Sequence, residues 1–245
     1  MISKIFVDIG LIAGIYYLQF KDQIGRYLFF GFLIPVGVFF IATAATSREP
    51  AFHLRFFTAS ILLSFSMLTI MWLGSIIIED RFFGRLKLFI TAPVSPISYV
   101  LGILVYACTL GLMTGSALIL FAYIYGIPAQ PHLLELVTLA VLTVSAFTGV
   151  SIVVSQYAKN LQTGSVLADS TSISLIFFAP VYYPIEELPK GMQVIASLFP
   201  TTYAATGIAD ALSGRGVSGT DLLALLMISA ITLTLAVYFL RWREP

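Results

Sequence analysis

Residues 136–155 read LVTLAVLTVSAFTGVSIVVS, a long run without a charged side chain. A helix of about 20 residues is about 30 Å long, which matches the hydrocarbon thickness of a lipid bilayer. The run does not alternate apolar and polar residues, as a strand of a transmembrane barrel would. It is also longer and more apolar than most helices in soluble cores. The sequence therefore predicts a transmembrane helix over 136–155.

Five further stretches have the same character, at 27–46, 56–78, 97–127, 161–185 and 222–240. The composition agrees with them: 59% of the residues are hydrophobic, 10% are charged, and the mean hydropathy is +0.98. A soluble domain usually carries about 25% charged residues, so this chain cannot cover a water-facing surface of normal size and membrane lipid is its expected solvent. We expect an all-α polytopic membrane protein with six transmembrane helices, forming a single transmembrane domain over 1–245.

The first 25 residues form a shorter apolar segment. Residues 5–20 carry one charge, Asp8, and Lys4 and Lys21 flank them. The segment lacks the small-residue cleavage site of a signal peptide and is short for a seventh span. One helical stripe in it is apolar, comprising Ile5, Ile9, Ile12, Tyr16 and Phe20. This pattern favours a helix that lies in the membrane interface over 1–25.

The basic residues predict the orientation of the chain. With both termini in the cytoplasm and six spans between them, nine of the 13 lysines and arginines fall on the inner side and four on the outer side. Basic residues concentrate on the cytoplasmic side of membrane proteins. We therefore expect a multi-pass protein of the plasma membrane with cytoplasmic N- and C-termini.

The inner connection at 79–96 begins with a cluster of charges and then becomes amphipathic. Pro93 and Pro96 follow, and proline breaks helices. The segment predicts a short helix along the cytoplasmic face. Such a helix either lies on the membrane surface, anchored by Arg85 and Lys87, or receives force from a soluble partner. The candidate contact residues are Glu79, Asp80, Arg81, Phe82, Phe83, Gly84, Arg85, Leu86 and Lys87.

The outer connection at 186–220 is long and not very polar. Leu188, Met192, Ile195 and Phe199 fall on one helix face, and prolines bracket the helix that they predict. Segments of this kind lie in the interface or dip into the membrane where protein covers their backbone. We expect a partly re-entrant helical segment before the last span, which acts either as a lipid-facing cap or as a lid on an exit path.

Two segments resemble motifs of the type-2 ABC-transporter permeases. Residues 84–95, GRLKLFITAPVS, resemble the family segment G-T-L-E-x-L-x-x-T-P-V-S. Residues 178–204 are similar to the family region F-P-x-x-x-L-P … N-P-x-T-Y, and order, spacing and span count agree over nearly the whole chain. The small drug and lipid exporters are the subgroup that it resembles. The chain departs from the pattern where Arg85 and Lys87 replace Thr and Glu, and where Phe199 replaces Asn.

The resemblance implies a transport subunit that is not an enzyme. Such permeases pair as dimers, here a homodimer, and each copy binds a separate cytoplasmic nucleotide-binding ATPase subunit, which holds ATP and Mg²⁺. The present sequence contains no G-x-x-x-x-G-K-[ST] phosphate loop of its own. The implied cargo is hydrophobic or amphipathic and leaves the cytoplasm. The alternatives are a polysaccharide or glycolipid export permease of the same superfamily, and a secondary carrier or channel without an ATPase.

Asp169 is the one acid well inside a predicted span, and an acid at that depth is costly. It hydrogen-bonds a neighbouring helix, lines the inner entrance of a transport path, or couples to protons. Phe177, Phe178, Tyr182 and Tyr183 follow toward the outer side, where aromatic residues form either an interfacial belt or a gate on the dimer axis. These five residues are the candidates for a translocation path or gate.

The remaining residues indicate no other chemistry. Cys108 is the only cysteine, and neither His53 nor His132 has a second ligand at metal spacing, so we expect no metal site. The net charge of +1 gives no indication of nucleic-acid binding. Gly111 and Gly115 form a G-x-x-x-G pair, which packs either within the chain or at a dimer seam.

Overall fold

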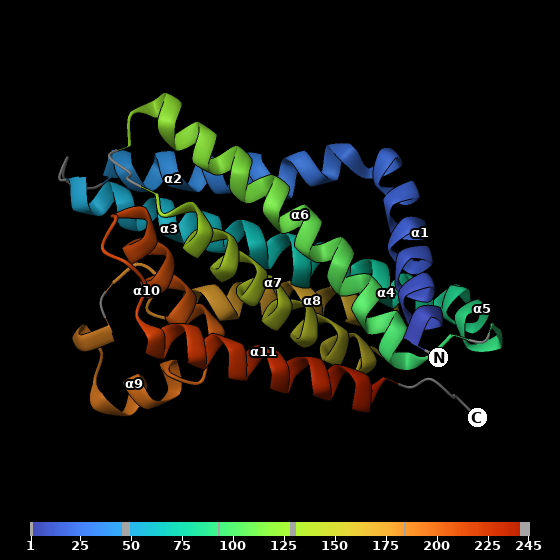
Figure 1. The fold of residues 1–245 in the computed structure, drawn as a ribbon. Coiled ribbons are helices and arrows are strands. Elements are labelled where there is room, and N and C mark those ends of the chain that lie inside the picture. Colours follow the sequence, from blue (N-terminus) through green and yellow to red (C-terminus); the bar gives the residue numbers. More distant parts are fainter. Residues whose placement is uncertain (1, 46–49, 93, 128–130, 184, 241–245) are drawn as a thin grey trace.

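The computed structural model describes residues 2–45, 50–92, 94–127, 131–183 and 185–240, which fold into helices without a strand (Figure 1). In chain order the elements are α1 Ile2–Leu28, η1 Phe29–Leu33, α2 Ile34–Ala45, α3 Pro50–Ser66, η2 Met67–Trp72, α4 Leu73–Phe82, α5 Arg85–Thr91, α6 Pro96–Tyr125, α7 Leu133–Gln156, α8 Leu161–Phe177, η3 Ile185–Glu187, α9 Lys190–Ala196, α10 Pro200–Leu212 and α11 Gly219–Phe239. The predicted all-α polytopic architecture is confirmed. Some residues used in the predictions lie outside the described ones, namely Arg48, Pro93, Pro184, Arg241 and Arg243.

Five helical segments of the described chain are long and apolar enough to cross a membrane: Lys4–Ala45, Phe52–Phe82, Pro96–Tyr125, Leu133–Gln156 and Gly219–Phe239. The helix predicted over 161–185 is α8, which ends earlier, at Phe177. The cause is Pro180, because a proline ring clashes with the carbonyl four residues before it. With 17 residues, α8 is about 26 Å long, and its crossing of the membrane as a sixth span stays a prediction.

Two of the long segments contain a π-helical turn, η1 and η2. In η1 the amide of Ile34 bonds to the carbonyl of Phe29, five residues back, and η2 closes in the same way. The two turns meet inside the bundle. The Ser64 hydroxyl donates to the Gly31 carbonyl at 2.6 Å, and a Cβ at Gly31 would lie 3.1 Å from the Leu68 side chain.

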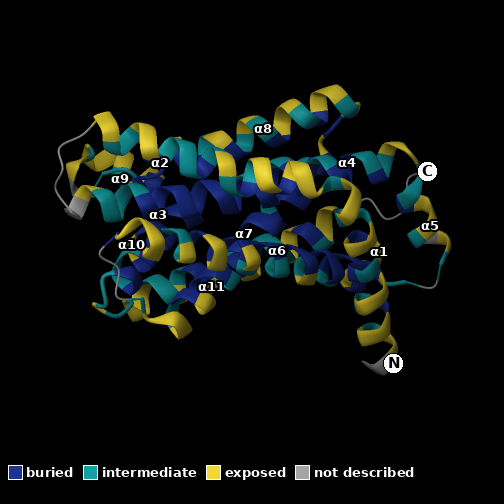
Figure 2. Ribbon diagram, turned by 90° about the horizontal axis from the view of Figure 1, so that it is seen from above, coloured by how far each residue is buried: buried dark blue, intermediate teal, exposed yellow. Residues whose placement is uncertain are grey.

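The helix predicted over 1–25 is α1, which lies across the ends of the other long helices (Figure 1 and Figure 2). Its predicted stripe packs on the protein: Ile12 and Tyr16 are buried, and a Cβ at Gly102 of α6 would lie 2.7 Å from the Ile12 side chain. Other apolar residues of α1 are exposed, namely Phe6, Val7, Leu11, Ile15 and Leu18. One apolar face against α6 and a second one exposed suit a helix between protein and lipid.

The outer connection forms a helical cap at the end of the bundle opposite α5 (Figure 1). It contains α10, a largely buried helix that the apolar pattern did not predict, whose Thr201 hydroxyl donates to the Leu175 carbonyl of α8 at 2.8 Å. The predicted apolar helix is the short α9, and its Met192 and Ile195 are exposed. The cap therefore contacts α8 through α10, whereas α9 lies on its exposed side.

The glycine pair in α6 packs within the chain. A Cβ at Gly111 would lie 2.7 Å from Val144 of α7, and a Cβ at Gly115 would lie 3.5 Å from Phe65 of α3. Small residues let helices approach closely in a membrane. Of the two alternatives for the G-x-x-x-G pair, internal packing is therefore the one that the structure supports.

Candidate functional site

The predicted contact segment forms a sharp corner between α4 and α5. Gly84 separates the two helices with φ 81°, a left-handed conformation that only glycine adopts without strain. The Lys87 amide bonds to the Gly84 carbonyl at 3.0 Å and closes the turn. Pro96 begins α6 instead of ending α5, with Ser95 as its N-cap. The corner places α5 outside the bundle, at the same end as α1 (Figure 1).

Asp80 fastens four helices at this corner. It is 2% exposed, and its Oδ2 accepts a hydrogen bond from the Tyr16 hydroxyl of α1 at 2.7 Å. Its Oδ1 pairs with Arg85 Nε of α5, also at 2.7 Å. The Tyr16 hydroxyl lies 3.3 Å from the hydroxyl of Tyr99 in α6. A buried carboxylate needs both a counter-charge and hydrogen bonds, and this cluster supplies them from three other elements.

Arg81, the next residue, points to a different neighbour. Its Nη1 donates to the carbonyls of Ser155, Gln156 and Ala158, at distances of 3.0 to 3.3 Å. These carbonyls end α7 and lead to Asn160, which caps α8. A cation at a helix C-terminus satisfies unpaired carbonyls and interacts favourably with the helix dipole. Arg81 thus ties the corner to the turn between α7 and α8.

The predicted contact residues therefore divide into two groups. Asp80 and Leu86 are buried, and Glu79, Arg81, Gly84 and Arg85 are partly buried. The others are exposed, and with Leu88 they make a small apolar and basic patch. Phe83 and Leu88 are each 69% exposed. We call Phe83, Lys87 and Leu88 the corner surface. Phe82, which is less exposed, lies beneath the Arg81 guanidinium at 5.4 Å.

Three residues of this site were missed by sequence reasoning, namely Tyr16, Leu88 and Tyr99. Leu88 belongs to the amphipathic segment, but its exposure depends on the turn at Gly84, which the charge pattern does not specify. The two tyrosines lie in apolar runs, 64 and 83 residues apart from their partners in the cluster. A polar hydroxyl inside an apolar helix was the available signal, because a buried hydroxyl needs a partner.

An exposed row of side chains runs along α8, where two of the candidate path residues, Asp169 and Phe177, lie. Val166, Ser170, Ile173 and Phe177 lie on one helix face and are exposed, and we call them the α8 stripe. Asp169 lies at the edge of the stripe, partly buried. It makes no hydrogen bond or ion pair with another described residue.

The aromatic candidates are only partly brought together. The ring of Tyr182 lies 6.1 Å from that of Phe177 and 6.1 Å from that of Phe56 in α3. Phe178 is exposed beyond them, and Tyr183 points to a separate cavity at the end of the bundle. Asp169 lies about 12 Å from Phe177 along the helix axis. The five candidates therefore do not form a single cluster, and only Asp169 and Phe177 lie on α8 itself.

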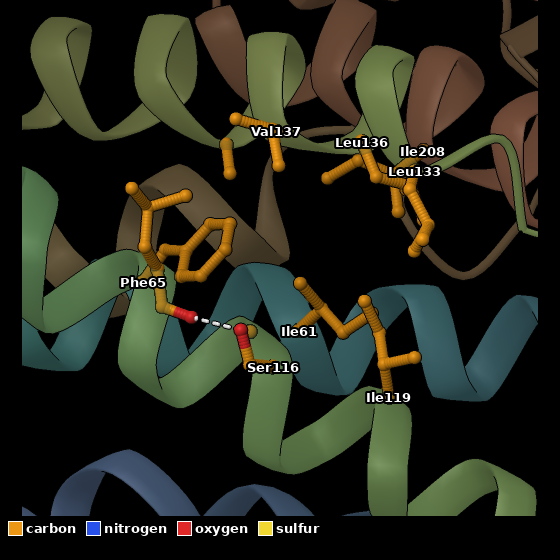
Figure 3. A pocket seen from close by; sticks show the side chains of 11 residues that line it. Ile61, Phe65, Ser116, Ile119, Leu133, Leu136, Val137 and Ile208 are labelled. Atoms are coloured by element: carbon orange, nitrogen blue, oxygen red, sulfur yellow. Dashed lines mark hydrogen bonds between the residues drawn. The ribbon is translucent and has the colours of Figure 1, made fainter.

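A lateral pocket of about 90 Å³ lies between α3, α6, α7 and α10. Figure 3 shows apolar side chains facing it from each of these helices, among them Phe65, Leu136 and Ile208. The hydroxyl of Ser116, its one polar side chain, donates back to the Leu112 carbonyl at 2.7 Å. The pocket can therefore hold an alkyl group or a small ring but offers no hydrogen-bond donor. Within the described residues no three His, Cys, Asp or Glu side chains group as a metal site would require.

Comparisons with known proteins agree on the class of protein. Residues 7–212 match the family model described as ABC-2 type transporter. The chain is 30% identical over 186 residues to the linearmycin resistance permease protein LnrN of Bacillus subtilis (strain 168), a match that covers 72% of this chain and 47% of that protein. The chain thus spans about half the length of the curated relative it matches. From the family match over most of its length, this chain belongs to the ABC-2 type transporter family, whose members are the permease components of transporters.

Proposed function

We propose that this chain is the transmembrane subunit of an ABC exporter, and that α5 docks a separate nucleotide-binding ATPase. The observation that carries the proposal is the corner. Its base is fixed to α1, α4 and α6 through Asp80, whereas Phe83, Lys87 and Leu88 are left exposed. This patch has two large apolar side chains and one cation, and the residues beneath it are fixed to the bundle. Such a patch can bind a soluble partner and transmit its movement to the membrane helices.

The charge of the corner surface indicates the character of the partner. Lys87 of the corner surface is exposed, and the neighbouring Arg85 is about one-third exposed but is paired with Asp80. Both stand where the family pattern has uncharged or acidic residues. Because opposite potentials face each other across specific interfaces, the groove of the ATPase should be more acidic than is usual for the family. ATP and Mg²⁺ would bind on that subunit and not on this chain.

The α8 stripe supports a second copy of the chain as the other half of the transporter. A carboxylate without a partner cannot face lipid at depth without a large cost. Asp169 therefore needs either a partner chain or water beside it. A homodimer that places the two α8 stripes toward each other would supply both, with a path between them. Phe177 and Tyr182 would narrow that path toward the cap.

The cargo and direction follow from the same surfaces. The α8 stripe has one hydroxyl among three large apolar side chains, which suits a hydrophobic or amphipathic cargo. The name of LnrN refers to resistance, which favours export over import. The start of α1 and the end of α11 lie at the same end as α5 (Figure 1), so an ATPase at α5 would put both of these ends in the cytoplasm and the cap outside the plasma membrane.

The test is co-purification with the ATPase subunit and stimulation of its activity. The variant Phe83→Ser/Leu88→Ser should lose most ATPase association and stimulation, because it removes the apolar part of the corner surface. A matched control is Ile195→Ser/Leu198→Ser, which removes two exposed apolar residues at the opposite end. Equal association of both variants with the ATPase would overturn the docking role. Transport by vesicles that contain this chain alone would instead favour a secondary carrier.

A further inference from the structure

Two adjoining cavities lie at the cap end of the bundle and share Arg55 and Ala209. Their volumes are about 260 Å³ and 120 Å³. Arg215 lines the larger cavity, and Thr58, Tyr183 and Thr206 line the smaller one. We propose that this double cavity binds the phosphate or carboxylate group of an amphipathic molecule, with the guanidinium groups of Arg55 and Arg215 as its anion ligands.

Arg55 is the centre of the site because it is charged and partly buried without a counter-charge. It lies on α3, and no carboxylate or other acceptor among the described residues bonds to it. A guanidinium cannot lose its proton, so burial leaves a charge that needs an anion from elsewhere. Neither cavity has a carboxylate among its lining residues. Two nearby acids that contact a lining residue are engaged there, Asp210 with Arg215 and Asp221 with Thr206.

Arg215 is held in place by its own turn. Gly214 and Gly216 on either side have φ 71° and 76°, left-handed conformations that favour glycine and shape the turn from α10 to α11. Arg215 Nε donates to the Ser213 hydroxyl at 3.1 Å, and Nη2 pairs with Asp210 Oδ1 at 3.1 Å. These contacts fix one edge of the guanidinium. Its Nη1 keeps donors for an external acceptor, and a planar guanidinium suits the two oxygens of a phosphate or carboxylate.

The three hydroxyl groups that line the smaller cavity differ in whether they can donate a hydrogen bond to an anion. Thr58 donates to the Leu54 carbonyl at 3.0 Å, and Thr206 lies 2.8 Å from Asp221 Oδ2, so neither offers a free proton. The Tyr183 hydroxyl has no hydrogen-bond partner among the described residues and can add a third donor to the two arginines. Tyr183 is thereby given a role apart from the other four candidate path residues, with which it was grouped from the sequence.

The apolar walls explain why the ligand should be amphipathic. Phe52 and Leu54 flank the arginines in the larger cavity, and Val181 and Ile185 line the smaller one. A bare ion would leave these side chains uncovered, whereas an acyl chain or ring attached to the anion would cover them. The statement that the cap end lies outside the membrane rests on the proposed function. The binding of an anion here does not require an ATPase.

The experiment is a binding titration of the purified chain in detergent, followed by thermal unfolding and by native mass spectrometry. The probes are soluble dioctanoyl phosphatidylglycerol, its uncharged counterpart dioctanoylglycerol, which has the same acyl chains without a phosphate, and inorganic phosphate. The phosphatidylglycerol should bind the unmodified chain. Arg55→Gln should weaken that binding about tenfold or more, since one charge-assisted hydrogen bond is lost at a partly desolvated site. Arg55→Lys should retain part of the affinity.

Arg215→Gln provides a second variant whose folding is not at risk, because its side chain is 71% exposed. It should weaken binding as well, by less than Arg55→Gln. The matched control is Lys190→Gln, which removes an exposed cation at the same end that lines neither cavity. Competition by inorganic phosphate would show that the anion alone is recognised, and its absence that the lipid tail contributes. Equal binding of both lipids, or equal binding by Arg55→Gln and Lys190→Gln, would overturn the site.

Discussion

The α4–α5 corner and the α8 stripe both carry charge in a largely apolar protein, but they differ in what satisfies it. At the corner Asp80, Arg81 and Arg85 all bond within the chain. On α8, Asp169 has no such partner in the part of the chain that the structure describes, and large side chains around it are exposed. The difference teaches that a cluster of charged residues in the sequence can form contacts within the chain, whereas a single acid can mark a surface that another molecule contacts. The role of a charged residue therefore depends on whether neighbouring residues of the same chain supply its hydrogen bonds and counter-charge.

The largest effect is expected from breaking the fastening itself. Asp80→Ala removes the acceptor of Tyr16 and the counter-charge of Arg85. It should lower the free energy of unfolding by about 3 kcal/mol, the lower end for a broken buried pair, because Arg85 is partly exposed. Equilibrium unfolding in detergent measures this. Asp210→Ala breaks the more exposed pair with Arg215 and should cost less than about 1 kcal/mol. Equal losses for the two variants would mean that the corner is not a fastening.

The next largest effect on stability is expected from substitutions that compare the face of α8 packed on the bundle with its exposed stripe. A Cβ at Gly164 would lie 2.8 Å from Ile78 of α4 and 2.9 Å from Ala158. Gly164→Val should therefore destabilise the chain by about 1–3 kcal/mol through overpacking. Ser170→Val, on the exposed stripe, should change the stability of the isolated chain by less than about 0.5 kcal/mol. Similar values for both would argue that α8 has no preferred face toward the bundle.

A smaller effect is expected where the corner meets the turn between α7 and α8. Arg81→Gln cannot reach the three carbonyls that Arg81 satisfies, so the end of α7 should lose about 1–2 kcal/mol of local stability. Hydrogen exchange at 155–163 should become faster, while exchange in α5 stays unchanged. Lys159→Gln, an exposed cation in the same turn, is the control and should leave exchange as it is. Unchanged exchange in Arg81→Gln would contradict the link to α8.

The smallest effect on stability is expected at Asp169. Asp169→Asn should shift the free energy of unfolding of the isolated chain by less than about 0.5 kcal/mol, because no internal contact is lost. Transport by the assembled exporter should nevertheless fall. A loss of stability above about 1 kcal/mol would show that Asp169 has an internal role, and the comparison with Asp80 would then fail.

The sequence predicted those parts of the fold that depend on local composition. Run length and apolarity were enough for α7 and α11, and the amphipathic pattern with the prolines after it was enough for a short helix within 79–96, although its break from α4 at Gly84 was not predicted. Pro180 also indicated the early end of α8, but the apolar residues around Pro180 led to the prediction of a helix as far as residue 185. The buried α10 was missed because its buried face is made mostly of threonine, alanine and glycine, which do not stand out as an apolar run in the sequence.

The fastening of the corner could not be predicted because its partners are distant in the chain. Tyr16 and Asp80 lie 64 positions apart, and nothing near either residue specifies the other. Sequence reasoning also grouped nine corner residues by adjacency, whereas the turn at Gly84 sorts them into buried and exposed ones. Side-chain direction at a corner depends on backbone dihedral angles that a charge pattern does not encode.

The paired π-helical turns at Phe29–Leu33 and Met67–Trp72 have a consequence for how the chain can change length. Each such turn amounts to one residue inserted into an α-helix without altering the direction in which the flanking segments face. Deleting one residue from Met67–Trp72 would restore a regular turn, and α3 and α4 would keep their present neighbours. A deletion within Pro50–Ser66 would instead rotate everything after it by about 100°. Natural or engineered single-residue deletions in these two spans should therefore be tolerated only at the π-helical turns.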